Sequence, residues 1–157
     1  MIEEAREIIQ EAKLVGLPTV IWSYPRGGDI SKEGETAIDI CEYGAHIASL
    51  LGAHIIKVKL PTSYLENNEA KKIYESEKIP INSLTERVKH IVQSCFNGKR
   101  IVIFSGGIAK SENDLLNEVK AIRDGSANGS IIGRNIFQRP YKEAIDLLDT
   151  ICKIYSN

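Results

Sequence analysis

Short apolar runs alternate along the chain with longer segments in which apolar residues recur at helical spacing. The short runs predict strands, because they are rich in β-branched and aromatic residues and are bounded by proline or glycine. Strands are expected at residues 18–24, 54–60, 100–104 and 129–132. Helices are expected at residues 2–15, 33–51, 68–77, 83–95, 111–124 and 140–155. Apart from the short segment 68–77, the predicted order is αβαβαβαβα.

This order and the apolar character of the strands predict an α/β fold. Nearly continuous apolar strands joined by helical crossovers are typical of a parallel sheet covered by helices. Ser83, with Glu86 three residues later, is a capping box that marks the start of one of these helices. No linker or shift in composition divides the chain, so residues 1–157 are expected to form a single domain.

Charge and composition exclude several classes of partner. The chain has 20 Lys and Arg against 21 Asp and Glu, a net charge of -1, which does not favour nucleic acid or an anionic membrane. The apolar runs are far shorter than a membrane span, and the acidic, amphipathic N-terminus is unlike a secretory signal. Three widely separated cysteines suggest buried, reduced thiols rather than disulfides or a zinc site. We therefore expect a soluble, cytoplasmic protein.

The residues with chemical potential fall at the carboxyl ends of the predicted strands, where parallel α/β folds place their active sites. Trp22, Tyr24 and Arg26 alternate at the end of the first strand, so their side chains should leave one face together. An aromatic pair on a strand beside a surface arginine would give the same pattern.

Lys57 lies within the apolar second strand. It either reaches solvent at the strand end or points inward as a desolvated amine, which is one way a lysine becomes nucleophilic towards a carbonyl. Lys59 shares its face and could modulate that amine through its charge, but we favour a solvated loop position for Lys59. The three histidines show no metal-ligand spacing and are expected to be structural or to lie on the surface.

Glycines follow the third and fourth strands. Ser105, Gly106 and Gly107 come after one strand, and Gly133 and Arg134 come after the next. Glycines at such turns let backbone N–H groups approach an anion, and a following helix N-terminus adds a favourable dipole. Ordinary turn glycines are the alternative, but two consecutive strand ends, one with an arginine, favour a phosphate site.

Four motifs together resemble the archaeal-type class I fructose-1,6-bisphosphate aldolases, which belong with the deoxyribose-phosphate aldolase group of TIM barrels. The motifs are WSYPRGG (22–28), GAHIIKVKLP (52–61), IFSGG (103–107) and IIGRNIFQRP (131–140). The resemblance implies that this chain holds only the last four βα units of the (β/α)8 barrel, a C-terminal half-barrel. A complete barrel usually needs about 250 residues, and the family's first-strand aspartate has no counterpart here.

The resemblance also implies a mechanism and a set of site residues. The protein would reversibly cleave fructose 1,6-bisphosphate to dihydroxyacetone phosphate and glyceraldehyde 3-phosphate, with no metal and no cofactor. Lys57 matches the lysine that forms the Schiff base, and Tyr24 matches the tyrosine that transfers protons. The matching substrate-binding positions are Trp22, Arg26, Ser105, Gly106, Gly107, Gly133 and Arg134.

Two other functions remain open at this point. The chain could act on another phosphorylated ketose, or it could be a catalytically silent half-barrel that binds phosphate or a partner. Four strands of a barrel leave two open sheet edges, and the inner strand faces should expose Val, Ile and Phe. We therefore expect a homo-oligomer or pairing with a separate N-terminal half-barrel.

Overall fold

Four parallel strands form one sheet in which the strands lie in chain order, β1-β2-β3-β4. The structure, a computed structural model, describes residues 2–156. The strands are β1 (Val20–Ser23), β2 (Ile55–Val58), β3 (Ile101–Ser105) and β4 (Gly129–Ile131). The helices are α1 (Ile2–Leu14), η1 (Gly34–Thr36), α2 (Ile38–Leu50), α3 (Asn68–Ser76), α4 (Leu84–Ser94), α5 (Glu112–Asp124), α6 (Arg134–Phe137) and α7 (Tyr141–Ser156). The predicted α/β class and parallel sheet are confirmed.

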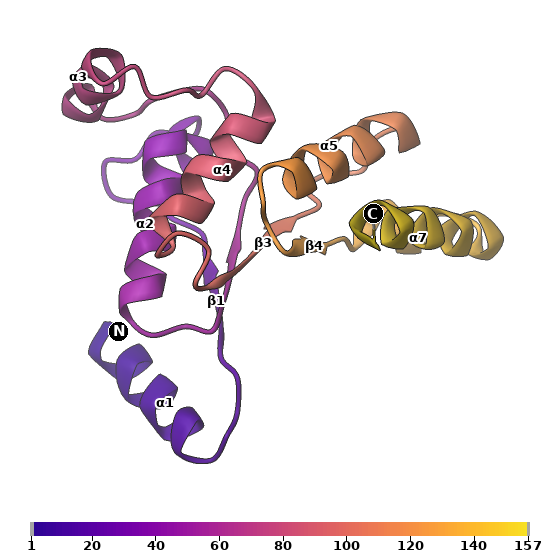
Figure 1. The fold of residues 1–157 in the computed structure, drawn as a ribbon, viewed down its shortest axis with the longest axis horizontal. Helices are drawn as coiled ribbons and strands as arrows, with labels where there is room; N and C mark the ends of the chain where they lie inside the picture. The colour runs from indigo at the N-terminus through magenta and orange to yellow at the C-terminus, as the bar shows by residue number, and fades with distance from the viewer. Residues whose placement is uncertain (1, 157) are drawn as a thin grey trace.

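The core lies between one face of the sheet and the helices. Alternate residues of the two central strands, Ile56 and Val58 on β2 and Val102 and Phe104 on β3, are fully buried on this face. They pack against apolar residues of α2, α4 and α5. Neighbouring helices also contact one another, α2 with α4, α4 with α5 and α5 with α7 (Figure 1). A second, smaller cluster joins α5 to α7.

The opposite face of the sheet is partly exposed to solvent. The strand register places Trp22, Lys57 and Ile103 side by side on this face. Val20, Ile101 and Ile131 are 46%, 44% and 43% exposed. The expectation of exposed Val and Ile is therefore confirmed, whereas the expectation for Phe is wrong, because Phe104 on β3 faces the helices and is fully buried.

The segment 33–51, predicted as one helix, is divided into η1 and α2. Ala37 between them is extended, with φ −59° and ψ 141°, and forms a β-bridge with Thr62. The N–H of Ile38, at the start of α2, donates to the carbonyl of Tyr64 at 3.0 Å. These partners lie beyond β2, so nothing within residues 33–51 could reveal the break.

Local sequence signals predicted the start of α4 correctly, but they did not predict the shortest helix, α6. The capping box is confirmed, because the N–H of Glu86 donates to Ser83 Oγ and the N–H of Ser83 donates to Glu86 Oε2. Helix α6, residues 134–137, was not predicted. Four residues are too few for a helical repeat of apolar positions to be recognised.

The three histidines are held in structural hydrogen bonds, as expected. Their partners are the N–H of Thr19 for His54 at 3.0 Å, Tyr74 Oη for His90 at 2.7 Å, and the carbonyl of Ser94 for His46 at 2.8 Å. Within residues 2–156, no group of three or more His, Cys, Asp or Glu side chains could hold a metal ion.

The cysteines are free thiols. Cys41 and Cys95 are buried, but Cys152 is exposed, so the expectation of buried thiols is wrong for Cys152, which lies on the outer surface of α7. Burial raises the pKa of the Cys41 thiol to about 12, so this group stays protonated at neutral pH. None of the described helices is long and apolar enough to cross a membrane.

Candidate active site

The carboxyl ends of all four strands border one cavity of about 500 Å³. The cavity is lined by Trp22, Tyr24, Lys57, Lys59, Ser105, Gly106, Gly107, Ile108, Ile131, Gly133, Arg134 and Phe137. It thus brings together every site residue expected from the sequence except Arg26. Arg26 is exposed in the loop after β1 and does not line the cavity.

Lys57 points inward. The residue is only 6% exposed, and it lies on β2 between Trp22 of β1 and Ile103 of β3. Its Nζ lies 3.5 Å from the centroid of a Trp22 ring and 5.8 Å from the centroid of the Tyr24 ring. A cation over an aromatic face gains about 0.5–2 kcal/mol. The aromatic rings of Trp22 and Tyr24 therefore stabilise the inward position of Lys57.

Lys57 also has no competing anion. Among residues 2–156, no carboxylate forms an ion pair with its ammonium group. The structure gives Lys57 no hydrogen-bond partner within the same residues. An amine that is contacted by ring faces rather than by a carboxylate has no salt bridge to break before its lone pair attacks a carbonyl.

Lys59 lies in the loop after β2, as expected, but it is partly buried in an ion pair rather than solvated. Its Nζ lies 2.7 Å from Glu35 Oε2, and its side chain is partly buried. Lys32 Nζ contacts the other oxygen, Oε1, at 2.9 Å. The hydrogen bonds from Lys59 and Lys32 lower the pKa of Glu35 to about 2, so the carboxylate is ionised at neutral pH. Lys59 is therefore ion-paired with a carboxylate, whereas Lys57 forms no ion pair among residues 2–156.

Tyr24 stands between the two lysines. The Tyr24 and Trp22 ring centroids are 6.0 Å apart, and the Tyr24 ring centroid lies 5.7 Å from Lys59 Nζ. Tyr24 follows β1 directly, so its position is set by the strand end. A phenol beside a primary amine is a suitable group for moving protons near a carbonyl carbon bound to that amine.

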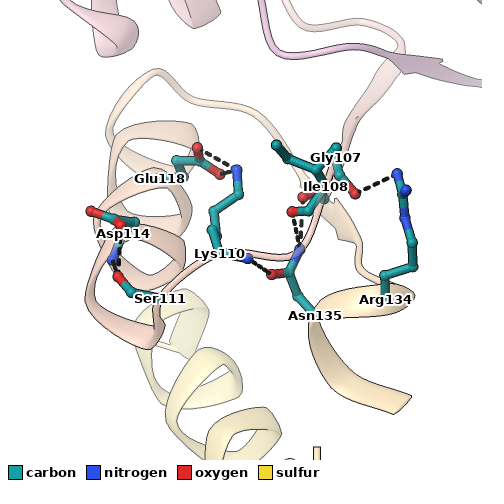
Figure 2. Close-up of polar contacts among 9 residues, drawn as sticks. Gly107, Ile108, Lys110, Ser111, Asp114, Glu118, Arg134 and Asn135 are labelled. Atoms are coloured by element: carbon teal, nitrogen blue, oxygen red, sulfur yellow. Dashed lines mark hydrogen bonds and ion pairs between the residues drawn. The ribbon is translucent and has the colours of Figure 1, made fainter. Parts of the chain in front are cut away.

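The glycine loops form the other end of the cavity. Gly107 has φ +65°, a left-handed conformation that favours glycine. Gly106 allows close approach of the next strand end, because a Cβ there would lie 3.2 Å from Ile132 Cα. Arg134 Nη2 donates to the carbonyl of Gly107 at 3.0 Å (Figure 2). In the described part of the chain, the N–H groups of Gly107 and Ile108 have no hydrogen-bond acceptor.

The sequence predicted that the N-terminus of the following helix would contribute a favourable dipole at this loop. The start of α5 is separated from Gly107 by residues 108–111 and is already capped. Helix α5 begins only at Glu112, and Ser111 caps it by accepting from the N–H of Asp114. Glu112 and Asp114 lie in its first turn, where their negative charges compensate the helix dipole. An anion at this loop would therefore be bound by Arg134 and the loop N–H groups rather than by the dipole of α5.

Some residues near the site were not found from the sequence. Glu35 carries no motif, and its contact with Lys59 spans 24 residues. Phe137 lines the cavity from α6, an element that was itself missed. Asn135, on the same helix, contacts the loop after β3 and is buried. Only the IIGRNIFQRP motif could have drawn attention to these last two residues.

Parallel strands in chain order, with a cavity at their carboxyl ends, define this chain as four βα units of a (β/α)-barrel protein. Comparison with known protein families gives the particular group. Residues 1–139 match the model of the DeoC/LacD family aldolases, and the chain belongs to that family.

Individual relatives agree with this assignment. The chain is 34% identical over 152 residues to the fructose-bisphosphate aldolase class 1 of Halobacterium salinarum, covering 96% of this chain and 48% of that relative. It superposes on a crystal structure of an archaeal fructose 1,6-bisphosphate aldolase with a TM-score of 0.77 and 31% identity, covering 100% of this chain and 52% of the other. The resemblance to class I aldolases is thereby confirmed.

A further solved structure bears on the chemistry. It is an archaeal fructose-1,6-bisphosphate aldolase with its catalytic lysine covalently bound to the carbinolamine intermediate of its substrate. This chain matches it with a TM-score of 0.76 and 30% identity, covering 100% of this chain and 52% of the other. The chain spans about half the length of the curated relatives it matches.

Proposed function

We propose that this chain carries the Schiff-base half of a class I fructose-1,6-bisphosphate aldolase, with Lys57 as the nucleophile. One observation carries the proposal. Lys57 is a buried lysine without an ion pair among residues 2–156, and it faces a cavity that also contains Arg134 and the glycine loop. The class I relatives supply the reaction that such an arrangement fits.

The first steps join substrate and protein. The neutral amine of Lys57 attacks the carbonyl carbon C2 of the ketose, and the carbonyl oxygen gains a proton. The hydroxyl group of this carbinolamine takes up a proton and leaves as water. The iminium ion that remains has a positive charge that makes C2 an electron sink. The C3–C4 bond can then break, because its electron pair moves into an enamine between C3, C2 and the lysine nitrogen.

Tyr24 is proposed to handle the protons of the cleavage step. The C4 hydroxyl loses its proton as C4 becomes the aldehyde carbon of glyceraldehyde 3-phosphate. The Tyr24 hydroxyl group carries that proton to C3 of the enamine. Water then adds to the iminium carbon, dihydroxyacetone phosphate leaves, and the amine of Lys57 is regenerated. The water lost in forming the iminium is returned in this step, the proton taken up with it is released, and no cofactor or metal takes part.

The phosphate is proposed to bind at the opposite end of the cavity. The Arg134 guanidinium uses one N–H for Gly107 and has others for an anion. The N–H groups of Gly107 and Ile108 are unpaired within the described residues, and both residues line the same cavity. Ser105, Gly106 and Gly133 line the same end. Trp22 covers the amine end, and the assignment of Arg26 rests on the resemblance alone.

We further propose that complete activity needs a second set of four βα units. Strands β1 and β4 are the edges of the sheet, and an unpaired strand edge is a template for another strand. Val20, Ile101 and Ile131 are apolar but exposed on the inner face, and a closed barrel would bury them. Either a second copy of the chain or a separate N-terminal half could supply the missing strands. The assembled enzyme could equally be an aldolase for a related phosphorylated ketose.

Two organisational features complete the proposal. Residues 1–157 are taken as one structural domain, because the sheet is continuous and the main core cluster spans β2, β3, α2, α4 and α5. A cytoplasmic location is supported by the widely separated free thiols of Cys41, Cys95 and Cys152, since free cysteines persist in reducing compartments.

Borohydride trapping tests the central step. Reduction in the presence of dihydroxyacetone phosphate should attach the substrate carbon to Lys57, located by peptide mass spectrometry, and Lys57→Met should abolish the adduct. Lys59→Met is the matched control, and it should retain the adduct. An adduct on Lys59 would move the nucleophile from Lys57 to Lys59. No adduct in the wild type despite phosphate binding would refute Schiff-base chemistry and favour a silent phosphate-binding half-barrel.

The partner proposal has its own test. Sedimentation should be measured for the purified chain alone and for the chain mixed with a four-strand N-terminal half. Association should appear in one of these two samples. Fructose-bisphosphate cleavage should appear only in the associated form. A stable monomer that cleaves fructose bisphosphate at about 1 s⁻¹ or faster, an ordinary enzyme rate, would overturn the need for a partner.

A further inference from the structure

Asn135 is a buried polar residue to which the reaction scheme assigns no role. It lies on α6 and is only 2% exposed. Its Nδ2 donates to the carbonyls of Gly106 and Ile108, each at 2.9 Å, and its Oδ1 accepts from the N–H of Lys110 at 2.8 Å (Figure 2). Both amide hydrogens and the amide oxygen are therefore bonded to one loop.

We propose that Asn135 is a positioning residue that holds the loop 106–110 in the shape that accepts the substrate phosphate. The inference rests on the proposed function, because it assumes that a phosphate binds at this loop. It goes further by assigning the shape of the loop to a side chain from the next βα unit.

Peptide geometry explains how the contact could act. In a trans peptide, a carbonyl and the following N–H point in opposite directions. Because Asn135 bonds the carbonyl of Gly106, the N–H of Gly107 is turned away from Asn135. The Arg134 contact with the carbonyl of Gly107 fixes the direction of the Ile108 N–H in the same way. Gly107 and Ile108 both line the cavity, and their N–H groups, like that of Ala109, have no acceptor among residues 2–156.

The loop needs such a restraint. Two consecutive glycines give its backbone many alternative conformations, and Gly107 already occupies the left-handed region. A loop that must be ordered by its ligand binds that ligand more weakly, because binding bears the entropy cost. Asn135 removes this cost beforehand by bonding both sides of the glycine turn.

Arg139 in turn anchors Asn135. Its Nε donates to the Asn135 carbonyl at 2.7 Å, and its Nη2 donates to the carbonyl of Lys110 at 3.4 Å. Its Nη1 lies 3.8 Å from Glu112 Oε2 at the start of α5. The short helix α6 is therefore tied to the same loop from two directions, which limits relative movement of the two strand ends.

The test replaces Asn135 by leucine, which has the same branching and number of side-chain heavy atoms but cannot form the three hydrogen bonds. We expect Asn135→Leu to weaken binding of inorganic phosphate, measured by calorimetry, by about tenfold or more. Asn128→Leu is the matched control, because Asn128 Oδ1 accepts from the N–H of Val102 at the other end of the same strand pair. This control should leave phosphate affinity unchanged.

A second readout separates positioning from general damage. The dihydroxyacetone phosphate concentration that gives half-maximal borohydride trapping should rise about tenfold in Asn135→Leu. Trapping of unphosphorylated dihydroxyacetone should not change, because Lys57 is untouched. Equal losses with both ketones would overturn the proposal, since they would indicate a collapsed site rather than a disordered phosphate loop.

The wild-type protein gives an arm that does not depend on a folded variant. Hydrogen exchange should show the Lys110 amide protected before phosphate is added, and the Gly107 and Ile108 amides protected only afterwards. Unchanged exchange at both glycine-loop amides in saturating phosphate would overturn the proposal. A wild type that binds no phosphate overturns the proposed function as well, whereas normal phosphate affinity in Asn135→Leu overturns only the role of Asn135.

Discussion

Replacing Arg134 by alanine removes a cationic side chain that lines the glycine-loop end of the cavity. The guanidinium lies at the start of α6, where its Nη2 donates to the carbonyl of Gly107 at 3.0 Å. That bond is exposed to solvent, so water can replace it when the side chain is lost. We therefore expect a change in unfolding free energy of at most about 0.5 kcal/mol, the usual range for a surface substitution.

The effect on phosphate binding should be much larger. A hydrogen bond to a charged group contributes about 1.5–3 kcal/mol. Since about 1.4 kcal/mol corresponds to a factor of ten in affinity, Arg134→Ala should weaken binding of dihydroxyacetone phosphate by about 10- to 150-fold. Arg134→Lys should lie between the two, because it keeps the charge but loses the planar fork that matches phosphate oxygens.

The assay is the concentration dependence of borohydride trapping at Lys57, which separates binding from trapping at saturation. Arg134→Ala should raise the half-saturating concentration and reach the wild-type plateau. Arg6→Ala, which removes an equal charge from an exposed position on α1, is the control for long-range electrostatics. Unchanged half-saturation in Arg134→Ala, or an equal rise in Arg6→Ala, would show that the phosphate does not bind at this arginine.

Three further changes test other parts of the site. Tyr24→Phe should keep the Lys57 adduct but slow solvent-deuterium exchange at the hydroxymethyl carbon of dihydroxyacetone phosphate by about 10²–10⁴-fold, measured by NMR. Lys59 and Lys32 lower the pKa of Glu35 to about 2. The stabilisation from ionised Glu35 should therefore be present above about pH 4.5 and be lost as the pH falls towards 2. In Glu35→Gln, the free energy of unfolding should depend less on pH between these values. Gly106→Ala should weaken phosphate binding, because its Cβ would lie 3.2 Å from Ile132 Cα and force the loop apart, and a wild-type affinity would show that the loop tolerates the shift.

The sequence predicted what depends on local pattern and on strand direction. The four strands, their parallel order and the capping box at Ser83 followed from period, turn residues and spacing. The convergence of Trp22, Tyr24 and Lys57 followed from one rule, that the carboxyl ends of parallel strands meet at one edge. The sequence could not decide whether Lys57 pointed inward, because that depends on the aromatic ring paired beside it in register.

Contacts between distant segments account for what the sequence missed. Lys59 was expected in solvent, but its partner Glu35 comes from η1, a turn that an isolated β-bridge separates from α2. Asn135 lies 25 residues from Lys110, and its helix is a single turn. No local periodicity can reveal a side chain whose function is to bond the backbone of a neighbouring loop.

The division of the site along the chain separates two parts of the proposed reaction. Lys57, Tyr24, Arg134 and the glycine loop all belong to the four strands present, and they surround one cavity. Formation of the iminium with dihydroxyacetone phosphate needs only these groups. Positioning the aldehyde half of a six-carbon substrate needs a wall on the exposed inner face, where Ile131 is still 43% accessible. Trapping and proton exchange should therefore persist in the isolated chain, while carbon–carbon cleavage should depend on the missing strands.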